Sequence, residues 1–291
     1  MPTLVCLGLG YCARFYVTEF GSRFERVVGT SRTPDKKTNG PTALVAFDGI
    51  HPSPELRQAV AEATHLLISA APGEAGDPVL AALAGDIAAA PKLQSIFYLS
   101  SLGVYGDHGG AWIDETAPTV SPHARSAARI EAERAWQALG GRRNTPVSIL
   151  RLAGIYGPGQ NAFVRLMAGR AHRITKPDHV FNRIHVADIA QAIDAAFARR
   201  FGGIVNVTDG EPAPPGDPIE FAAKLLGLAP PPVLSLDEAR RTLSPFLLSF
   251  YDGCARVRND KLRRELGVTL RYPDYRAGLQ ALFDEGFEAR D

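Results

Sequence analysis

The sequence lacks an excess of charge of either sign. Its 291 residues include 32 Lys and Arg against 31 Asp and Glu, so the formal net charge is +1. A protein that holds nucleic acid through its phosphates needs a basic surface, and this balance argues against that class. With 45% hydrophobic and 22% charged residues, the composition is that of a globular protein and excludes a disordered one.

The sequence is also poor in cysteine and has no long hydrophobic run. Cys6, Cys12 and Cys254 are odd in number and lack paired spacing, so neither a disulfide framework nor a zinc site is indicated. The opening residues lack the basic and apolar segments of a signal peptide, and no apolar run approaches the ~20 residues of a membrane helix. We therefore expect a soluble cytoplasmic protein without a metal site or a membrane partner.

Short apolar runs alternate with helical patterns through the first half of the chain. Helices are expected over 13–20, 78–90 and 126–139, the last of them ended by Gly140 and Gly141. The runs expected to form strands are 3–9, 26–30, 42–47, 65–70, 95–100 and 147–152. Strands that are apolar throughout and separated by helices indicate a parallel sheet covered on both faces. We predict an α/β protein with a doubly wound (Rossmann) sheet.

The regular alternation of strand and helix patterns ends after Gly157. The segments expected to be regular there are a helix over 161–171, a strand and helix over 184–196, and a strand over 204–207. Proline-dense stretches at 211–218 and 230–232 mark connections, because proline cannot continue a helix or a central strand. We expect a dinucleotide-binding domain of residues 1–157 plus 180–211. A smaller C-terminal substrate-binding region should comprise 158–179 plus 212–291.

A dinucleotide fingerprint stands between the first strand and the first helix. It has Gly8, Gly10 and Ala13 in its three defined places, with Tyr11 and Cys12 between the last two. Gly8 allows the tight turn, Gly10 lets the backbone approach a pyrophosphate, and Ala13 keeps the helix close to the strand. The helix N-terminus attracts the phosphate charge. These residues predict a pyridine nucleotide as cofactor.

The end of the second strand favours NADP over NAD. An NAD site carries an Asp or Glu there for the ribose 2′-hydroxyl, whereas this chain has Gly29-Thr30-Ser31-Arg32. Arg32 can form a fork on a 2′-phosphate, and Thr30 or Ser31 can donate hydroxyl hydrogen bonds. The alternative is that Arg32 is only a solvated loop residue.

Two further strand ends complete the predicted cofactor site. Asp48 follows the third strand, where a carboxylate could accept the adenine amino group. Ala70 and Ala71 follow the fourth strand and are small enough to let the backbone approach the cofactor. Each of these residues also has an ordinary explanation as part of a turn.

With these residues, the chain resembles the extended short-chain dehydrogenases/reductases of the epimerase/dehydratase branch. The similarity covers most of the length. Ser100-Ser101-Leu102-Gly103-Val104-Tyr105-Gly106 is similar to the family's Ser-Ser-x-x-Val-Tyr-Gly. Four other motifs follow in the family's order, at residues 114–118, 151–159, 183–190 and 206–209.

The resemblance implies chemistry by a Ser or Thr, a Tyr and a Lys, and only the first is present. Ser101 occupies the Ser position, where its hydroxyl would hold a substrate oxygen beside the nicotinamide. Counting back from Glu133 places Arg125 at the Tyr position and Arg129 at the Lys position. The family's Lys lowers the pKa of the phenol, but a guanidinium, with a pKa above ~12, exchanges no protons near neutrality. Arg129 could still serve as a fixed charge near the nicotinamide ribose, whereas Arg125 cannot replace the Tyr.

Three residues are candidates for the missing proton transfer. Tyr105 follows Ser101 in the same motif, Tyr156 follows the sixth strand, and His123 precedes the helix that carries Arg125. Each has a competing interpretation, since both tyrosines could pack against the sheet edge and His123 could be a solvated loop residue.

The sequence therefore supports three hypotheses. The first is an NADP-dependent oxidoreductase of an atypical extended type, which transfers a hydride on a small polar, sugar-like substrate. The second is an epimerase or dehydratase of a nucleotide-sugar, which uses the same step with internal return of the hydride. The third is a non-catalytic NADP-binding sensor or partner-binding protein. In each case a homodimer through helices beside residues 125–129 is possible.

Overall fold

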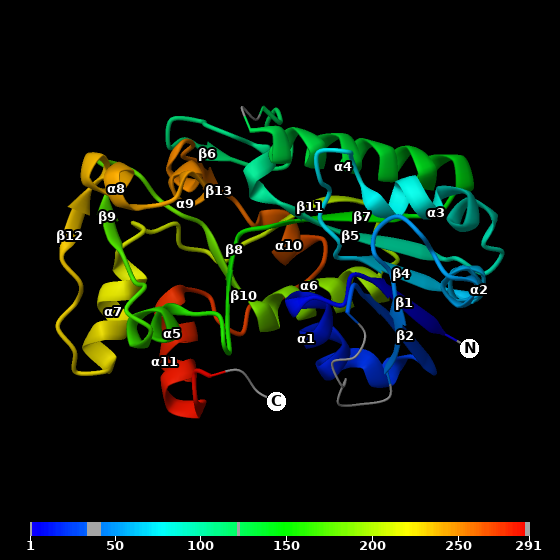
Figure 1. The fold of residues 1–291 in the computed structure, drawn as a ribbon, viewed down its shortest axis with the longest axis horizontal. Helices are drawn as coiled ribbons and strands as arrows, with labels where there is room; N and C mark the ends of the chain where they lie inside the picture. The colour runs from blue at the N-terminus through cyan, green and yellow to red at the C-terminus, as the bar shows by residue number, and fades with distance from the viewer. Residues whose placement is uncertain (1, 34–41, 121–122, 289–291) are drawn as a thin grey trace.

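The structure is a computed structural model that describes residues 2–33, 42–120 and 123–288. Its centre is a sheet of seven strands in the order β11-β7-β5-β4-β1-β2-β3, with every neighbouring pair parallel (Figure 1). The strands are β1 (Thr3–Leu7), β2 (Arg26–Ser31), β3 (Thr42–Ala46), β4 (His65–Ile68), β5 (Ser95–Ser101), β7 (Val147–Leu152) and β11 (Gly203–Val207).

Helices cover both faces of this sheet, which confirms the predicted doubly wound fold. One face carries α1 (Tyr11–Phe20) and α6 (Val186–Ala198), and the other carries α2 (Pro54–Glu62), α3 (Pro78–Ala89) and α4 (Ala124–Arg143). Alternate side chains of one strand enter opposite cores, as Cys6 and Leu7 do. The central strands are therefore mostly apolar, because both of their faces are covered by helices.

The helices α4 and α2 show where the structure of the main domain departs from the sequence-based prediction. The expected stop of α4 at Gly140 and Gly141 is wrong, since the helix continues to Arg143 and ends at Asn144, whose φ is 53°. A Cβ on Gly140 would lie 2.7 Å from the Thr145 carbonyl oxygen, so this glycine permits close packing instead of ending the helix. The helix α2 was not predicted, although Ser53 caps it.

A second layer of short elements forms a lobe beside the carboxyl edge of the sheet (Figure 1). Small parallel pairs join β8 (Gly154–Tyr156) to β10 (Arg183–His185), β9 (Arg173–Thr175) to β12 (Val233–Ser235), and β6 (Trp112–Ile113) to β13 (Arg256–Val257). The helices of this part are α5 (Ala162–Met167), α7 (Asp217–Leu225), α8 (Leu236–Thr242), α9 (Pro245–Leu248) and α11 (Tyr275–Glu285). The short helix α10 (Asp260–Arg264) packs instead against the core of the main sheet, beside β11. Three 3-10 turns, η1 (Gly21–Arg23), η2 (Leu102–Val104) and η3 (Ser249–Tyr251), complete the fold.

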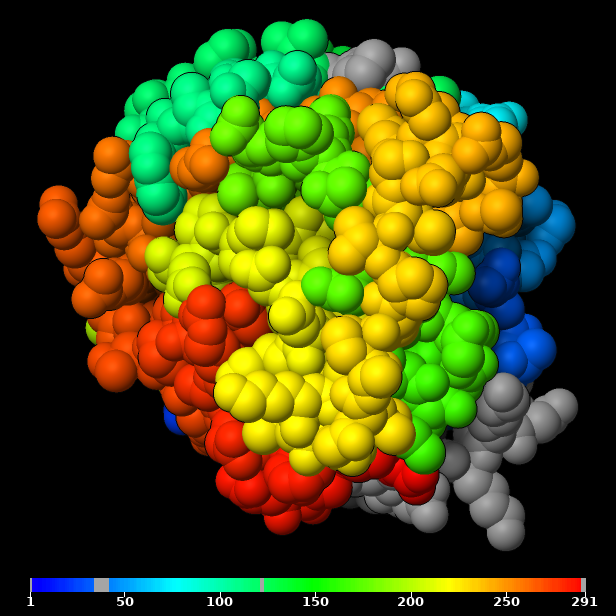
Figure 2. Space-filling model, turned by 90° about the vertical axis from the view of Figure 1, so that its left-hand side faces the viewer, coloured from blue at the N-terminus to red at the C-terminus, as the bar shows by residue number. Residues whose placement is uncertain are grey.

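Seen from its left-hand side, the molecule shows mainly this lobe (Figure 2). Segments from the second half of the chain fill most of that face, and the N-terminal residues appear only at its rim. Within the three described ranges, no helix combines the length and apolar character that a membrane crossing requires. The same ranges hold no group of three or more His, Cys, Asp or Glu placed to bind a metal ion.

Candidate functional site: a crevice at the carboxyl edge of the sheet

The carboxyl ends of the parallel strands bring the predicted site residues to one edge of the sheet. Gly8 follows β1, Ala70 follows β4, and Ser101 ends β5. In open α/β sheets, ligands bind outside this edge, and we call this part of the molecule the crevice. Here the edge faces the lobe of short elements (Figure 1).

The first glycine of the turn after β1 is required by the backbone. Gly8 has a φ of +94°, and a Cβ there would lie 2.7 Å from the backbone nitrogen of Ala70. The Gly8 amide donates to the Thr30 hydroxyl at 2.8 Å, and the Leu9 amide donates to the Thr30 carbonyl at 2.8 Å. The sequence had allowed Thr30 to donate its hydroxyl to a phosphate. In the structure Thr30 is buried and supports this turn instead.

The second glycine leaves open space where a cofactor must approach. Gly10 caps α1 in an extended conformation, and no side chain caps the first turn of that helix. A Cβ on Gly10 would meet, among the described residues, only the Ser69 hydroxyl at 3.7 Å. The protein's own packing therefore does not require a glycine here. A helix N-terminus without a capping side chain, approached over a glycine, fits the diphosphate of a dinucleotide.

The other fingerprint residues have distinct environments. Cys12 and Ala13 are buried against the sheet, and burial raises the pKa of the Cys12 thiol to about 12. Cys12 therefore stays a neutral thiol. Tyr11 is half-buried and its hydroxyl donates to the Pro158 carbonyl at 3.0 Å. This hydrogen bond joins the first turn of α1 to the loop after β8.

The predicted adenosine side of the crevice contains Ser31, Arg32 and Asp48. The Ser31 hydroxyl accepts a hydrogen bond from the Thr33 amide at 3.2 Å, and Arg32 is exposed. Asp48 is also exposed, and its carboxylate accepts hydrogen bonds from the amides of Ile50 and His51 at 2.7 Å each. These bonds, with a third from the His51 ring, hold the pKa of Asp48 well below its usual range. The Asp48 carboxylate therefore stabilises the turn after β3, which was the second interpretation that the sequence allowed. A contact between Asp48 and the adenine stays a prediction.

At the other end of the crevice, two serine hydroxyls lie near Gly103. Ser101 ends β5, and its hydroxyl accepts from the Gly103 amide at 3.1 Å. Ser126 stands in the first turn of α4. A Cβ on Gly103 would lie 3.4 Å from the Ser101 hydroxyl oxygen and 3.6 Å from that of Ser126. The sequence interpretation missed Ser126, although it directly follows Arg125.

Arg125 and Arg129 point to different partners. The guanidinium of Arg129 turns inward and donates to the Leu99 carbonyl at 2.9 Å. That of Arg125 reaches the C-terminal lobe, where it donates to the Ser249 hydroxyl at 3.0 Å. Its central carbon lies 4.7 Å and 5.1 Å from the ring centres of Phe246 and Phe250. One arginine therefore ties α4 to the sheet, and the other ties α4 to the lobe.

The tyrosines considered for proton transfer are both used in packing. Tyr105 is 1% exposed, and its hydroxyl donates to the Asn206 side chain at 2.8 Å. This geometry contradicts the predicted catalytic role, because a phenol sealed in the core cannot reach a substrate. Tyr156 is buried and donates to the Asp274 carbonyl at 3.3 Å. Burial raises the pKa of both phenols.

His123, the third candidate, lies at the start of α4. Its Nε2 is 3.2 Å from the carboxylate of Asp252, which belongs to the C-terminal lobe. This contact repeats the pattern of Arg125 and joins α4 to the same segment of the lobe.

A buried ion pair lies directly behind Ser101. Arg151 on β7 donates to both carboxylate oxygens of Glu133 on α4, with a closest distance of 2.7 Å, and the Ser100 hydroxyl donates to the same carboxylate. The two charged side chains are 5% and 4% exposed. Arg151 also stacks on Tyr105, with 4.8 Å between its guanidinium carbon and the ring centre. This network holds α4 against β5 and β7. The residue that could have indicated it in the sequence is Glu133, one helical turn beyond Arg129.

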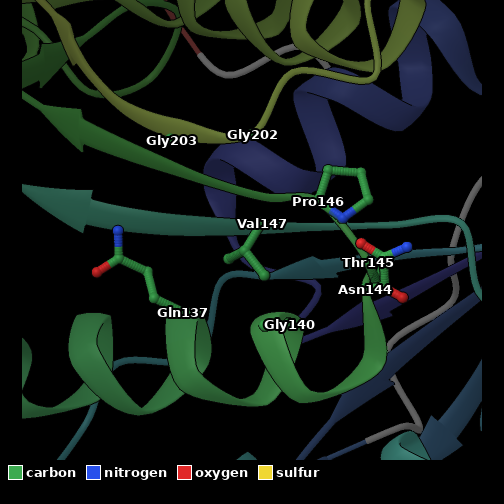
Figure 3. A pocket seen from close by; sticks show the side chains of 9 residues that line it. Gln137, Gly140, Asn144, Thr145, Pro146, Val147, Gly202 and Gly203 are labelled. Atoms are coloured by element: carbon green, nitrogen blue, oxygen red, sulfur yellow. The ribbon is translucent and has the colours of Figure 1, made fainter.

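A separate pocket of about 370 Å³ opens at the opposite edge of the sheet. It lies where β7 and β11 begin, beside the last turns of α4 (Figure 3). The residues lining it include Gln137, Asn144, Pro146 and Gly202, and none of them belongs to the crevice described above. Because α/β ligands bind at carboxyl strand ends, the crevice and not this pocket is the candidate site.

Comparison with known proteins places these features in context. The model of the NAD dependent epimerase/dehydratase family matches residues 73–208. The solved structure of a functionally unknown conserved protein from Silicibacter pomeroyi DSS is 46% identical, covers 99% of this chain and 100% of its own, and superposes with a TM-score of 0.89.

Two curated proteins match part of the chain. Protein YeeZ of Escherichia coli strain K12 is 34% identical over 194 residues, which cover 65% of this chain and 62% of that protein. A 3-diazoavenalumate denitrifying reductase from Streptomyces sp is 30% identical over 175 residues, or 57% of this chain and 58% of the reductase. The chain thus matches less than two thirds of the length of these curated relatives.

Proposed function

We propose that this chain, of which residues 73–208 match the NAD dependent epimerase/dehydratase family model, is an NADP-dependent oxidoreductase acting on a small polar substrate. The observation that carries this proposal is the open approach to the first turn of α1. There Gly10 leaves space and no side chain caps the helix. The denitrifying reductase among the relatives supports a reductase in particular.

The residues around the crevice suit a dinucleotide. Backbone amides of the first turn of α1 would hold the diphosphate, since a helix N-terminus carries partial positive charge. Arg32 would meet the 2′-phosphate, and Arg129 would add a fixed positive charge near the nicotinamide ribose. When bound, the cofactor supplies or accepts a hydride.

Ser101 is the residue proposed to orient the substrate. Its hydroxyl stands at the end of β5 and is held by the Gly103 amide, so it can donate its proton to a substrate oxygen. With both tyrosines in the core, the function of Ser101 is to bind and to support a developing negative charge. The substrate carbon would take the hydride, and solvent water in place of a tyrosine would supply the proton that its oxygen needs.

The preference for NADP is tested by replacing Arg32. We expect wild-type protein to bind NADP more tightly than NAD by isothermal titration calorimetry. In Arg32→Gln the affinity for NADP should fall about tenfold, which corresponds to the low end of the free energy of one charge-assisted hydrogen bond. The affinity for NAD should not change. Arg142→Gln, an exposed substitution at the far end of α4, is the matched control. Equal affinities for NADP and NAD in the wild type would remove the argument for Arg32.

The role of Ser101 is tested by turnover. We expect Ser101→Ala to slow NADPH consumption about tenfold on any carbonyl compound that the wild type reduces, the value of one hydrogen bond. The dissociation constant of NADP should stay the same, because Ser101 is assigned to the substrate. Unchanged turnover in this variant would refute the assignment.

Two other functions are distinguished by the same absorbance assay. An epimerase or dehydratase returns the hydride, so NADPH absorbance shows no net change while the product accumulates. A non-catalytic NADP sensor is favoured by one observation, namely that Arg125 and Arg129 both contact protein groups. A sensor would bind NADP and turn over none of the compounds tested.

A further inference from the structure

Arg125 is an exposed cation with an unusual set of neighbours. One of its N–H groups donates to the Ser249 hydroxyl, and two phenyl rings lie within 5.1 Å of its central carbon. In the parts of the chain that the structure describes, no carboxylate lies within 4.0 Å of its nitrogens. A guanidinium has five N–H donors, so most of them are left for a ligand.

This cation stands at the Ser101 end of the crevice. The hydroxyl of its chain neighbour Ser126 lies near Gly103, the residue whose amide donates to the Ser101 hydroxyl. One turn further along α4, Arg129 contacts the Leu99 carbonyl two residues before Ser101. The position of Arg125 on α4 therefore puts it near the substrate side of the crevice.

The lobe segment opposite Arg125 exposes apolar side chains. Phe246, Leu247 and Phe250 are 59%, 40% and 47% exposed, and they lie on α9 and η3. The His123–Asp252 contact holds the same segment to the start of α4. Since Asp252 already faces His123, the segment offers Arg125 aromatic rings but no competing negative charge. Exposed apolar groups beside a cation are typical of a ligand-binding surface.

We propose that Arg125, Phe246 and Phe250 bind a flat, conjugated carboxylic acid as the substrate class of the Ser101 site. The guanidinium would form a fork on the carboxylate, and the rings would stack on the conjugated body. Rings beside a guanidinium replace part of the water around it, which strengthens its bond to an anion. This inference rests on the proposed reductase function and names the substrate class for it.

The probes are cinnamate and its neutral isostere cinnamamide, titrated into NADP-saturated protein by calorimetry. We expect cinnamate to bind at least tenfold more tightly than cinnamamide. Arg125→Gln should abolish this difference, and Arg125→Lys should restore only part of it, because an ammonium keeps the charge but lacks the fork. Phe250→Ala should lower the affinities for cinnamate and cinnamamide by the same factor. Arg142→Gln is the control for loss of an exposed arginine on the same helix.

Three outcomes would overturn the inference. They are equal affinities for the two probes, no binding of cinnamate, and tighter binding of uridine diphosphate than of cinnamate. The NADP titration of the same samples keeps the two proposals apart. If the protein does not bind NADP but still prefers cinnamate to cinnamamide, only the cofactor proposal is refuted. If it binds NADP but shows no such preference, only the substrate class is refuted. Thermal unfolding of each variant shows that it is folded.

Discussion

Replacing Gly10 by valine is expected to weaken NADP binding at least a hundredfold, or about 2.7 kcal/mol. The added side chain would occupy the space through which the diphosphate must approach the first turn of α1. The protein itself has room for the Cβ, since Gly10 is extended at φ −85° and a Cβ there meets only the Ser69 hydroxyl among the described residues. The free energy of unfolding should therefore change by no more than about 1 kcal/mol.

Gly8→Ala provides the matched contrast. Its φ of +94° and the 2.7 Å approach of a Cβ to the Ala70 amide nitrogen make any side chain costly to the fold. We expect this variant to lose about 2 kcal/mol or more of stability in urea, from left-handed backbone strain plus the clash. If Gly10→Val bound NADP as tightly as the wild type, the diphosphate would not lie over this turn.

Replacing Glu133 by alanine is expected to destabilise the protein by about 3–5 kcal/mol. The substitution leaves the buried Arg151 guanidinium without its ion-pair partner and the Ser100 hydroxyl without its acceptor. A buried unpaired charge is more costly than the loss of the attraction alone. Urea unfolding followed by circular dichroism measures the difference.

Glu131→Ala serves as the control for this effect. Glu131 lies on the same helix and pairs with Arg134, but its side chain is 69% exposed. Exposed pairs contribute about 0–1 kcal/mol, so this variant should resemble the wild type. If the two glutamate variants had equal stability, the Glu133–Arg151 pair would not be what holds α4 on the sheet.

The local pattern was enough to predict the sheet and the glycine turn. Apolar runs separated by helical spacing require a sheet buried on both faces, and the observed strands begin within one residue of the predicted ones. Gly8 and Gly10 were identifiable because a strand, a glycine turn and a helix are adjacent in the chain. The stop of α4 was predicted wrongly, because a glycine that ends a helix and one that allows close packing look alike in sequence.

The chemical end of the crevice could not be predicted in the same way. Tyr105 stands four residues after Ser101, and only the structure shows that its phenol turns inward to Asn206, a residue about a hundred positions later. Arg125 contacts Phe246 and Phe250 across a similar separation. Such contacts depend on how the lobe packs against α4, and no short spacing encodes that.

The sequence by itself determined the type of sheet and the place of the glycine turn, because each depends on residues close together in the chain. Only the tertiary structure decided which side chains face the crevice. It buried Tyr105 and Tyr156, set the hydroxyls of Ser101 and Ser126 near Gly103, and directed Arg125 to the aromatic segment of the lobe. The physical reason is that the direction of a side chain at the edge of a sheet is set by packing between segments distant in sequence.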